Sequence, residues 1–253
     1  MKIGIIITVR MDSKRLPGKV LKKIKGKEIS KYIYERLEKT NVEKENIIFA
    51  TSKEKKDDEI AKFCNKNSYR CFRGTKDNVA LRLLNCAKYF NFDAFIRING
   101  DNVFTDKDVI NEMIKILKNN KYEIITNVPS RTFPYGTSVE IIRTKFYDNI
   151  YPHITDFSDR EHVTTYIYRN MDKFNVYNYK SNNKKFKDVK LALDTEKDFK
   201  IISKIIESFK DDHRKYNIDD IVDLYYLVTE KEWGFGIHKN FIFNYIVDWV
   251  FPS

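Results

Sequence analysis

Two aspartates of this sequence stand where carboxylates could hold a metal ion. Asp101 follows Gly100 at the end of one apolar segment, and Asp194 precedes Thr195 at the end of another. Because the carboxyl ends of parallel strands meet at one edge of an open α/β sheet, these carboxylates can converge although they are far apart in sequence. Magnesium is held by one or two carboxylates together with substrate phosphates. We therefore predict a magnesium site there, and a turn residue and a helix-flanking residue are the simpler alternatives.

A basic loop follows the first apolar segment and is dense in hydrogen-bond donors. Its sequence is Arg10-Met11-Asp12-Ser13-Lys14-Arg15-Leu16-Pro17-Gly18-Lys19. Arginine grips phosphate oxygens two at a time, and lysine acts as a compact positive charge, so the loop suits a triphosphate. It has neither the P-loop pattern nor the three-glycine dinucleotide pattern, which argues against both of those classes. An ordinary basic surface loop is the alternative.

The order of apolar and amphipathic segments predicts alternating strands and helices. We expect strands at 3–9, 47–51, 70–72, 94–98, 123–127, 137–142 and 189–193. We expect helices at 28–39, 57–66, 77–89, 159–170, 199–209 and 218–228, and one that is capped by Thr105 or Asp106. This alternation is typical of an α/β protein with a mainly parallel sheet and helices on both faces. The aromatic stretch 233–253 predicts a helix that packs on its own domain or contacts a second copy.

Length, charge and cysteine content narrow the class of protein. The chain has 253 residues and a formal charge of +11, which attracts anions, but its lysines are scattered and do not form one nucleic-acid-binding face. Its three cysteines have no metal-binding spacing, so we expect neither a disulfide framework nor a zinc site. No apolar run is long enough to cross a membrane. We predict a cytoplasmic protein with neither a nucleic-acid nor a membrane partner.

Several motifs resemble those of the cytidylyltransferases that make CMP-linked acidic sugars. This family includes the CMP-Kdo and CMP-sialate synthetases, and the resemblance is strongest to the branch of spore coat polysaccharide biosynthesis protein F. The opening motif is Arg10 with the run from Ser13 to Lys19. The others follow in the family's order over residues 1–198: Ala50-Thr51-Ser52, Asp57-Asp58, Phe72-Arg73-Gly74, Asp77-Asn78-Val79 with Arg82, Arg97 with Gly100-Asp101, Arg131-Thr132-Phe133-Pro134-Tyr135-Gly136 with Glu140, Arg160-Glu161-His162-Val163-Thr164, and Leu193-Asp194-Thr195 with Asp198.

The resemblance implies a Rossmann-like, glycosyltransferase-A-like nucleotidyltransferase fold in a single domain. The nucleotide-binding part would span about 1–127, and residues 128–253 would bind the acceptor and form a homodimer. CTP would be bound by Arg10, Ser13, Arg15, Lys19, Arg73, Asp77, Arg82 and Gly100. Catalysis would rest on Arg10, Lys19, Asp101 and Asp194, of which the two aspartates would hold Mg²⁺. The acceptor side would carry Arg131, Tyr135, Glu140, Arg160, Glu161 and His162, and His162 could equally be a helix-start residue bonded to the backbone.

We therefore predict transfer of CMP from CTP to a small anionic sugar-like acceptor, with release of pyrophosphate. A glycosyltransferase of the same fold is one alternative, but Asp101-Asn102-Val103 lacks the second carboxylate of the usual metal-binding pair. A basic nucleic-acid-binding protein is another, and the sequence has no helix-turn-helix, RRM or zinc-finger signature. An inactive scaffold is a third, against which the intact carboxylates and basic loop argue.

Overall fold

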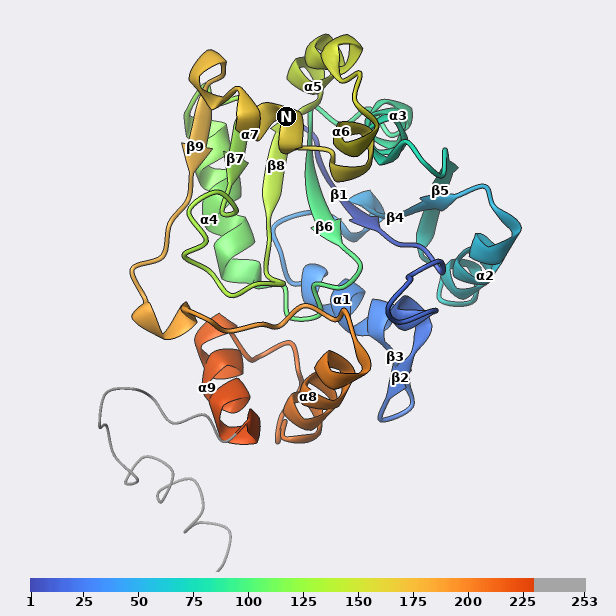
Figure 1. Ribbon diagram of the computed structural model, residues 1–253, viewed down its shortest axis with the longest axis vertical. Helices are drawn as coiled ribbons and strands as arrows, with labels where there is room; N and C mark the ends of the chain where they lie inside the picture. The colour runs from blue at the N-terminus through green and yellow to red at the C-terminus, as the bar shows by residue number, and fades with distance from the viewer. Residues whose placement is uncertain (230–253) are drawn as a thin grey trace, which may run out of the picture.

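A seven-stranded, mainly parallel sheet organises the protein (Figure 1). The structure is a computed structural model that describes residues 1–229, so the predicted helix within 233–253 lies outside the described residues. In spatial order the strands are β5 (Arg70–Gly74), β4 (Ile47–Ser52), β1 (Ile3–Thr8), β6 (Ala94–Asn99), β8 (Glu140–Arg143), β7 (Ile124–Thr126) and β9 (Val176–Asn178). Only β8 runs antiparallel to its neighbours within this sheet. Within residues 1–229 no helix has the length and apolar character needed to cross a membrane.

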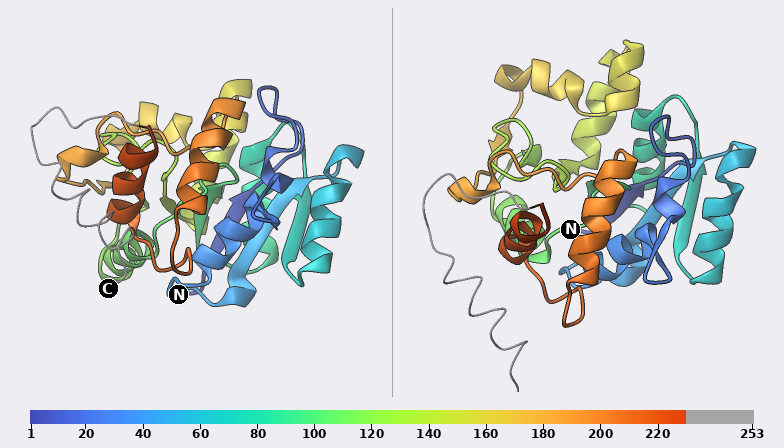
Figure 2. Two further views of the ribbon diagram at one scale, coloured as in Figure 1. Left: turned by 90° about the horizontal axis from the view of Figure 1, so that it is seen from below. Right: turned by 60° about the horizontal axis from the view of Figure 1, so that its bottom comes forward.

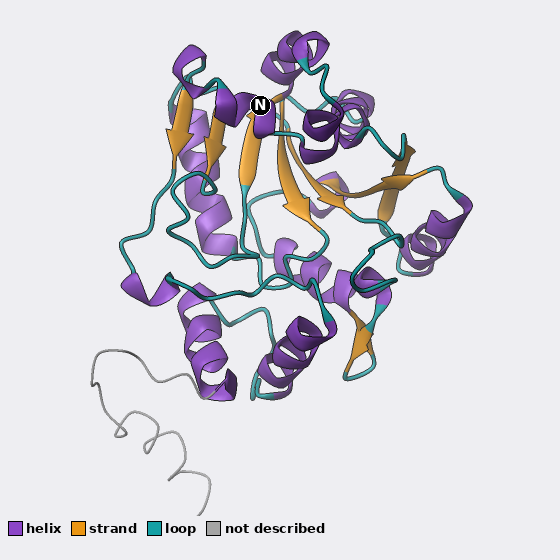
Figure 3. Cartoon of the chain, viewed as in Figure 1, coloured by secondary structure: helices purple, strands orange, loops and turns teal. Residues whose placement is uncertain are grey.

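Helices cover both faces of the sheet, as the sequence predicts (Figure 3). They are α1 (Ile29–Leu37), α2 (Asp58–Lys66), α3 (Val79–Tyr89), α4 (Lys107–Asn119), α5 (Thr144–Ile150), α6 (Phe157–His162), α7 (Thr165–Arg169), α8 (Glu196–Glu207) and α9 (Ile218–Thr229). Successive side chains of a strand point to opposite faces. Ile5 and Ile7 therefore pack with α1, α2 and α4, and Ile6 packs with α3 and α5. Figure 2 shows α8 and α9 near each other at the end of the described chain, and the two helices are in contact.

Side-chain caps satisfy the first amide groups of several helices, including α3, α4 and α8. The Asp106 carboxylate, one of the two residues predicted to cap α4, accepts from the amides of Asp108 and Val109. The Asn78 side chain caps α3 by accepting from the Leu81 amide. A capping box opens α8, with reciprocal bonds between Thr195 and Asp198.

Several predicted elements differ from the structure. Residues 189–193 form only two isolated bridges, Asn102 to Ala192 and Tyr135 to Lys190, because the segment crosses two loops and does not join the sheet. The helix predicted at 159–170 is two helices, separated by Val163 with φ 53° and ψ −55°. The structure also contains α5, β9 and a hairpin of β2 (Lys23–Ile24) and β3 (Lys27–Glu28), which we did not predict. The three strands among these are too short to show a hydrophobic period.

The buried guanidinium of Arg36 ties α1 to two distant loops. Its nitrogens donate to the carbonyls of Thr105 at 2.8 Å, His213 at 2.5 Å and Tyr216 at 2.8 Å. Burial lowers the pKa of Arg36 to about 10, while nearby Asp106 and other acidic groups favour its charged form. Arg36 therefore stays positive at neutral pH and satisfies three backbone oxygens at once.

We predict that Arg36→Met lowers the free energy of unfolding by about 3 kcal/mol, because it leaves three acceptors without a donor. Urea denaturation measures the change. The control is Arg214→Met, which removes only a partly exposed ion pair with Asp212 and should cost less than about 1 kcal/mol. Equal losses in the two variants would contradict the anchoring role.

Candidate functional site

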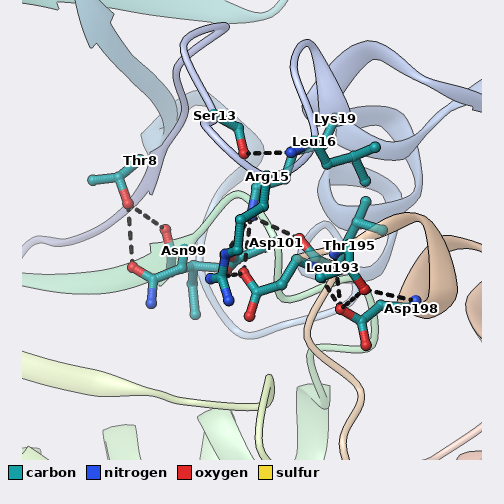
Figure 4. Close-up of polar contacts among 12 residues, drawn as sticks. Thr8, Ser13, Arg15, Leu16, Lys19, Asn99, Asp101, Leu193, Thr195 and Asp198 are labelled. Carbon is teal, nitrogen blue, oxygen red and sulfur yellow. Dashed lines mark hydrogen bonds and ion pairs between the residues drawn. The ribbon is translucent and has the colours of Figure 1, made fainter.

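The ammonium of Lys19 lies between the carboxylates of Asp101 and Asp194 at the carboxyl edge of the sheet. Figure 4 shows Asp101 of this site beside Arg15 and Leu193. Its Nζ is 2.8 Å from Asp101 Oδ2 and 3.3 Å from Asp194 Oδ1, and it donates to the Leu193 carbonyl at 2.6 Å. The side chains of Lys19 and Asp194 are only 13% and 7% exposed. Charges that are shielded from water interact more strongly than those at an open surface. The structure thus brings the two predicted metal ligands together around a residue of the basic loop.

Close packing behind β6 fixes the position of Asp101. The amide of Gly100 donates to the Thr8 carbonyl at 2.8 Å. A Cβ atom on Gly100 would lie 2.6 Å from Val9 Cγ1 and 2.8 Å from the Thr8 oxygen, so any larger residue would displace the turn. The Leu193 amide donates to the carbonyl of Asp101 at 3.1 Å, which holds the second carboxylate segment against the first. Gly100 therefore acts through the backbone, by allowing Asp101 to sit beside the end of β1.

Asp194 is held by the start of α8 and by two further cations besides Lys19. The carboxylate of Asp198 accepts from the amides of Asp194 at 3.1 Å and Thr195 at 2.8 Å. Burial raises the pKa of Asp198, but bonds from Lys190 and Thr195 outweigh it, so that the net pKa is lowered and the group stays ionised at neutral pH. Arg15 lies 3.0 Å from Asp194 Oδ1, and Lys190 lies 3.7 Å from its Oδ2. The helix cap and the ion pairs therefore fix this carboxylate from both sides.

The donor set fits a magnesium ion that shares its coordination with a substrate. Two carboxylates from separate loops meet around one positive group, so the position already favours a cation. Within residues 1–229 no group of three or more His, Cys, Asp or Glu side chains is arranged to hold a metal. Magnesium needs few protein ligands, because water and phosphate oxygens complete its octahedron.

The carboxylate of Asp57, at the start of α2, anchors the basic loop. Its Oδ1 accepts from the Met11 amide at 2.8 Å, and its Oδ2 accepts from the Ser52 amide at 3.2 Å and from the Ser52 hydroxyl. Burial raises the pKa of Asp57, but these bonds lower it by more, so the net pKa is below the ordinary value. Within the loop, the Ser13 hydroxyl accepts from the Leu16 amide at 3.4 Å. Ser13 thus shapes the loop that carries Arg15 and Lys19.

Arg82 is a buried cation behind the loop that joins β5 to α3. It is 3% exposed, and its Nη1 donates to the Thr75 carbonyl at 3.0 Å. Its Nε has no partner among the described residues. Burial lowers the pKa of Arg82 to about 10, with Asp57 opposing and Arg10 adding to the shift, so the group remains charged at neutral pH. A buried cation with a spare donor is suited to an anionic ligand.

Arg73 and Asp77, the other two residues predicted near the nucleotide, lie at the same carboxyl edge of the sheet. Arg73 donates to the carbonyls of Ser52 and Glu54, each at 3.0 Å, and pairs with Asp58 at 2.7 Å. Its guanidinium therefore already holds β5 against β4 and the start of α2. Asp77 is exposed in the loop before α3.

One ion pair links the basic loop to the predicted acceptor side. Arg10 Nη1 lies 3.3 Å from Glu161 Oε1, so these residues meet across the sheet edge. Arg160 and His162 flank Glu161 on α6 and are exposed, and Arg160 Nε donates to the Ile154 carbonyl at 3.2 Å. The pair thus places α6 beside the loop that carries Lys19.

Arg131 and Tyr135 lie beside the segment that leads to Asp194. The Arg131 guanidinium stands 5.7 Å from the centre of the Tyr135 ring. Tyr135 exchanges backbone bonds with this segment, since its amide donates to Val189 and its carbonyl accepts from Leu191. Gly136, with φ 101°, would bring a Cβ to 2.2 Å from the Ala192 nitrogen, so glycine is needed at this crossing.

Glu140 differs from the other predicted acceptor residues because it is buried. It is 2% exposed and bonds to Arg97, Thr164 and Tyr168. The carboxylate therefore lies beneath the predicted acceptor side and not on the protein surface. We did not predict Tyr168, nor the anchoring roles of Asp57 and Thr164. In the sequence, only their places in family-like motifs could have indicated the roles of Asp57 and Thr164.

We predict that Asp57→Asn lowers the free energy of unfolding by about 2 kcal/mol at pH 7, because an amide nitrogen cannot accept from Ser52. Asp57 has a lowered pKa when folded, so its stabilisation is present above the ordinary value of 3.8 and is lost as pH falls through the folded value. Denaturation of both proteins between pH 7 and pH 2 should show the gap closing at acid pH. A gap that stays constant with pH would contradict this account.

Comparison with known proteins places the chain in a family. A sequence model of the family "Cytidylyltransferase" matches residues 4–232. Spore coat polysaccharide biosynthesis protein SpsF of Bacillus subtilis is 28% identical over 214 residues, which are 81% of this chain and 86% of that protein. A 3-deoxy-manno-octulosonate cytidylyltransferase of Fusobacterium nucleatum is 31% identical over 121 residues, 48% of each chain.

A solved structure shows the same architecture. The cytidylyltransferase from Leptospira borgpetersenii superposes with a TM-score of 0.86 at 27% identity, covering 94% of this chain and 99% of that one. The predicted nucleotidyltransferase fold and the predicted resemblance to the SpsF branch are both confirmed. The chain belongs to the cytidylyltransferase family and is a CTP-dependent nucleotidyltransferase.

Proposed function

We propose that this enzyme transfers CMP from CTP to an oxygen of a small acidic sugar, a sugar or alditol phosphate, or a phosphonate, and releases pyrophosphate. The product would serve the synthesis of a surface polysaccharide or another glycoconjugate. The observation that carries the proposal is the convergence of Lys19, Asp101 and Asp194 beside the basic loop. Two carboxylates that favour a cation, next to several cationic donors, suit a metal-bound triphosphate.

The basic loop and the carboxylates have complementary roles toward the triphosphate. Arg10 and Arg15, with side chains 53% and 65% exposed, have donors available to phosphate oxygens. Lys19 is held between the carboxylates in the free protein, and we propose that it turns to a phosphate oxygen when the substrate binds. Asp101 and Asp194 would hold Mg²⁺, which supplies charge neutralisation at the α-phosphate and the leaving pyrophosphate.

The transfer is a single in-line displacement. The acceptor oxygen forms a bond to the α-phosphorus of CTP, the bond between that phosphorus and the bridging oxygen breaks, and pyrophosphate leaves. A hydroxyl acceptor also loses its proton to a base or to water, whereas an ionised phosphate or phosphonate has none to lose. Most of the rate effect comes from positioning and from neutralising charge.

The acceptor class follows from the relatives and from the charges opposite the loop. The Fusobacterium relative is named for an acidic sugar, and the SpsF relative for polysaccharide synthesis. Arg131, Arg160 and His162 are exposed or partly exposed on the predicted acceptor side, and they are suited to an anionic group. A homodimer, which the family resemblance implies, and a cytoplasmic location, which the cysteine content favours, are part of the same proposal.

Pyrophosphate release tests the proposal. The enzyme and Mg²⁺ are incubated with CTP, UTP, ATP or GTP and with a panel of 3-deoxy-manno-octulosonate, N-acetylneuraminate, glycerol 3-phosphate, glucose 1-phosphate and 2-hydroxyethylphosphonate. We expect release with CTP and with one class of acceptor. Sugar transfer from a nucleotide sugar without pyrophosphate release would favour the glycosyltransferase alternative instead.

We predict that Asp101→Asn and Lys19→Met each lower kcat by about a thousand-fold, because each removes a charge that acts on the triphosphate. Matched controls are Asp108→Asn on α4 and Lys22→Met, whose partners Lys107 and Glu196 lie outside the site. The controls should keep near-normal rates, and circular dichroism should show all four variants folded. Near-normal turnover of Asp101→Asn at saturating Mg²⁺ would exclude the metal role of Asp101.

A further inference from the structure

A buried polar network lies directly beneath the acceptor side and joins the sheet to the α6–α7 junction. Arg97, Glu140 and Thr126 stand in one row across β6, β8 and β7. Arg97 Nη1 lies 2.6 Å from Glu140 Oε2, and the hydroxyls of Thr164 and Tyr168 donate to Glu140 Oε1. Because the Tyr168 proton points to the carboxylate, the hydroxyl of Thr126, 2.8 Å away, is the donor in their contact. Every member of the row is therefore connected to α7 or to Thr164, the residue that precedes it.

The network ends at a backbone conformation that few residues adopt. Val163 has φ 53° and ψ −55°, and the Thr164 amide donates to the His162 carbonyl at 2.5 Å, which closes a γ-turn. Positive φ is unfavourable for a β-branched residue and persists only where the surroundings enforce it. Val163 is completely buried, and its carbonyl accepts from the Tyr147 hydroxyl at 2.8 Å. The bonds of Tyr147 and Thr164 thus hold both sides of the turn.

The turn decides where the preceding residues of α6 point. Glu161 and His162 come directly before Val163, and Glu161 reaches Arg10 of the basic loop at 3.3 Å. If the turn relaxed to an ordinary helical conformation, α6 and α7 would join and these side chains would rotate away. The carboxylate of Glu140 cannot itself bind an acceptor, because it is 2% exposed and both of its oxygens already accept hydrogen bonds.

We propose that Glu140, with Arg97, Thr164 and Tyr168, is a positioning group that holds the Val163 turn and so aims Glu161 and His162 at the acceptor. This inference rests on the proposed function for the identity of the acceptor, but the geometry of the turn does not depend on it. In this proposal Thr164 and Tyr168 act through Glu140 and the backbone, since their hydroxyls bond to its carboxylate, and not through contact with a substrate. Their removal should therefore weaken acceptor binding and leave CTP binding intact.

The first test needs no substrate. The sequence has four histidines, and His162→Gln assigns the His162 imidazole signal in a ¹H–¹³C spectrum of the labelled protein. Thr164→Val and Tyr168→Phe should shift or broaden that signal and leave the His213 signal unchanged. The matched control is Tyr166→Phe on the same helix. It also removes a tyrosine hydroxyl, but the Tyr166 ring packs near Phe174. An unmoved His162 signal in both network variants would overturn the proposal.

The second test uses the panel acceptor that supports pyrophosphate release. We expect Thr164→Val and Tyr168→Phe to raise the KM for that acceptor about ten-fold or more, with the KM for CTP changed less than about two-fold. Thr164→Ser keeps the hydroxyl and should restore the KM. Equal rises in both KM values, or no rise in either, would overturn the proposal. If no acceptor supports turnover, the proposed function fails separately, and the His162 signal alone decides this inference.

Discussion

The pairing of one ammonium with two carboxylates is the interaction on which the rest of the site depends. Asp101 and Asp194 come from loops far apart in sequence. Two carboxylates that are partly shielded from water would repel each other if no cation lay between them. Lys19 supplies that cation from the basic loop. Its side chain therefore joins the end of β1, the end of β6 and the start of α8 at a single point. A metal ion that entered here would meet a position already arranged for positive charge.

The surrounding contacts serve to keep these three groups in place. Asp57 holds the basic loop through the Met11 amide, and the capping box of α8 fixes the chain beside Asp194. Gly100 allows the close approach of the β6 turn to β1. On the other side of the sheet edge, the Arg10–Glu161 pair connects the same loop to α6, whose direction depends on the strained turn at Val163. The basic loop thus contacts both the start of α8, through Lys19, and α6, through Arg10.

Much of this arrangement could be predicted because it is local or follows from strand order. Residues close together in the sequence determine the apolar run of β1, the Asp106 cap and the α8 capping box. The convergence of Asp101 and Asp194 follows from the rule that strand ends share an edge. Residues 189–193 were mistaken for a strand because an apolar extended segment looks alike whether it joins a sheet or crosses two loops. The burial of Glu140 could not be foreseen, since its partners are 24 to 43 residues away.

Manganese binding followed by electron paramagnetic resonance tests the central claim most directly. The claim is that Asp101 and Asp194 form one cation site that a nucleotide completes. With a non-hydrolysable CTP analogue present, the enzyme should bind one Mn²⁺ per chain at this site, and Asp101→Asn and Asp194→Asn should each weaken that binding at least ten-fold, by about 1.4 kcal/mol or more. Lys19→Met should still bind the ion. Unchanged Mn²⁺ affinity in both aspartate variants would contradict the account.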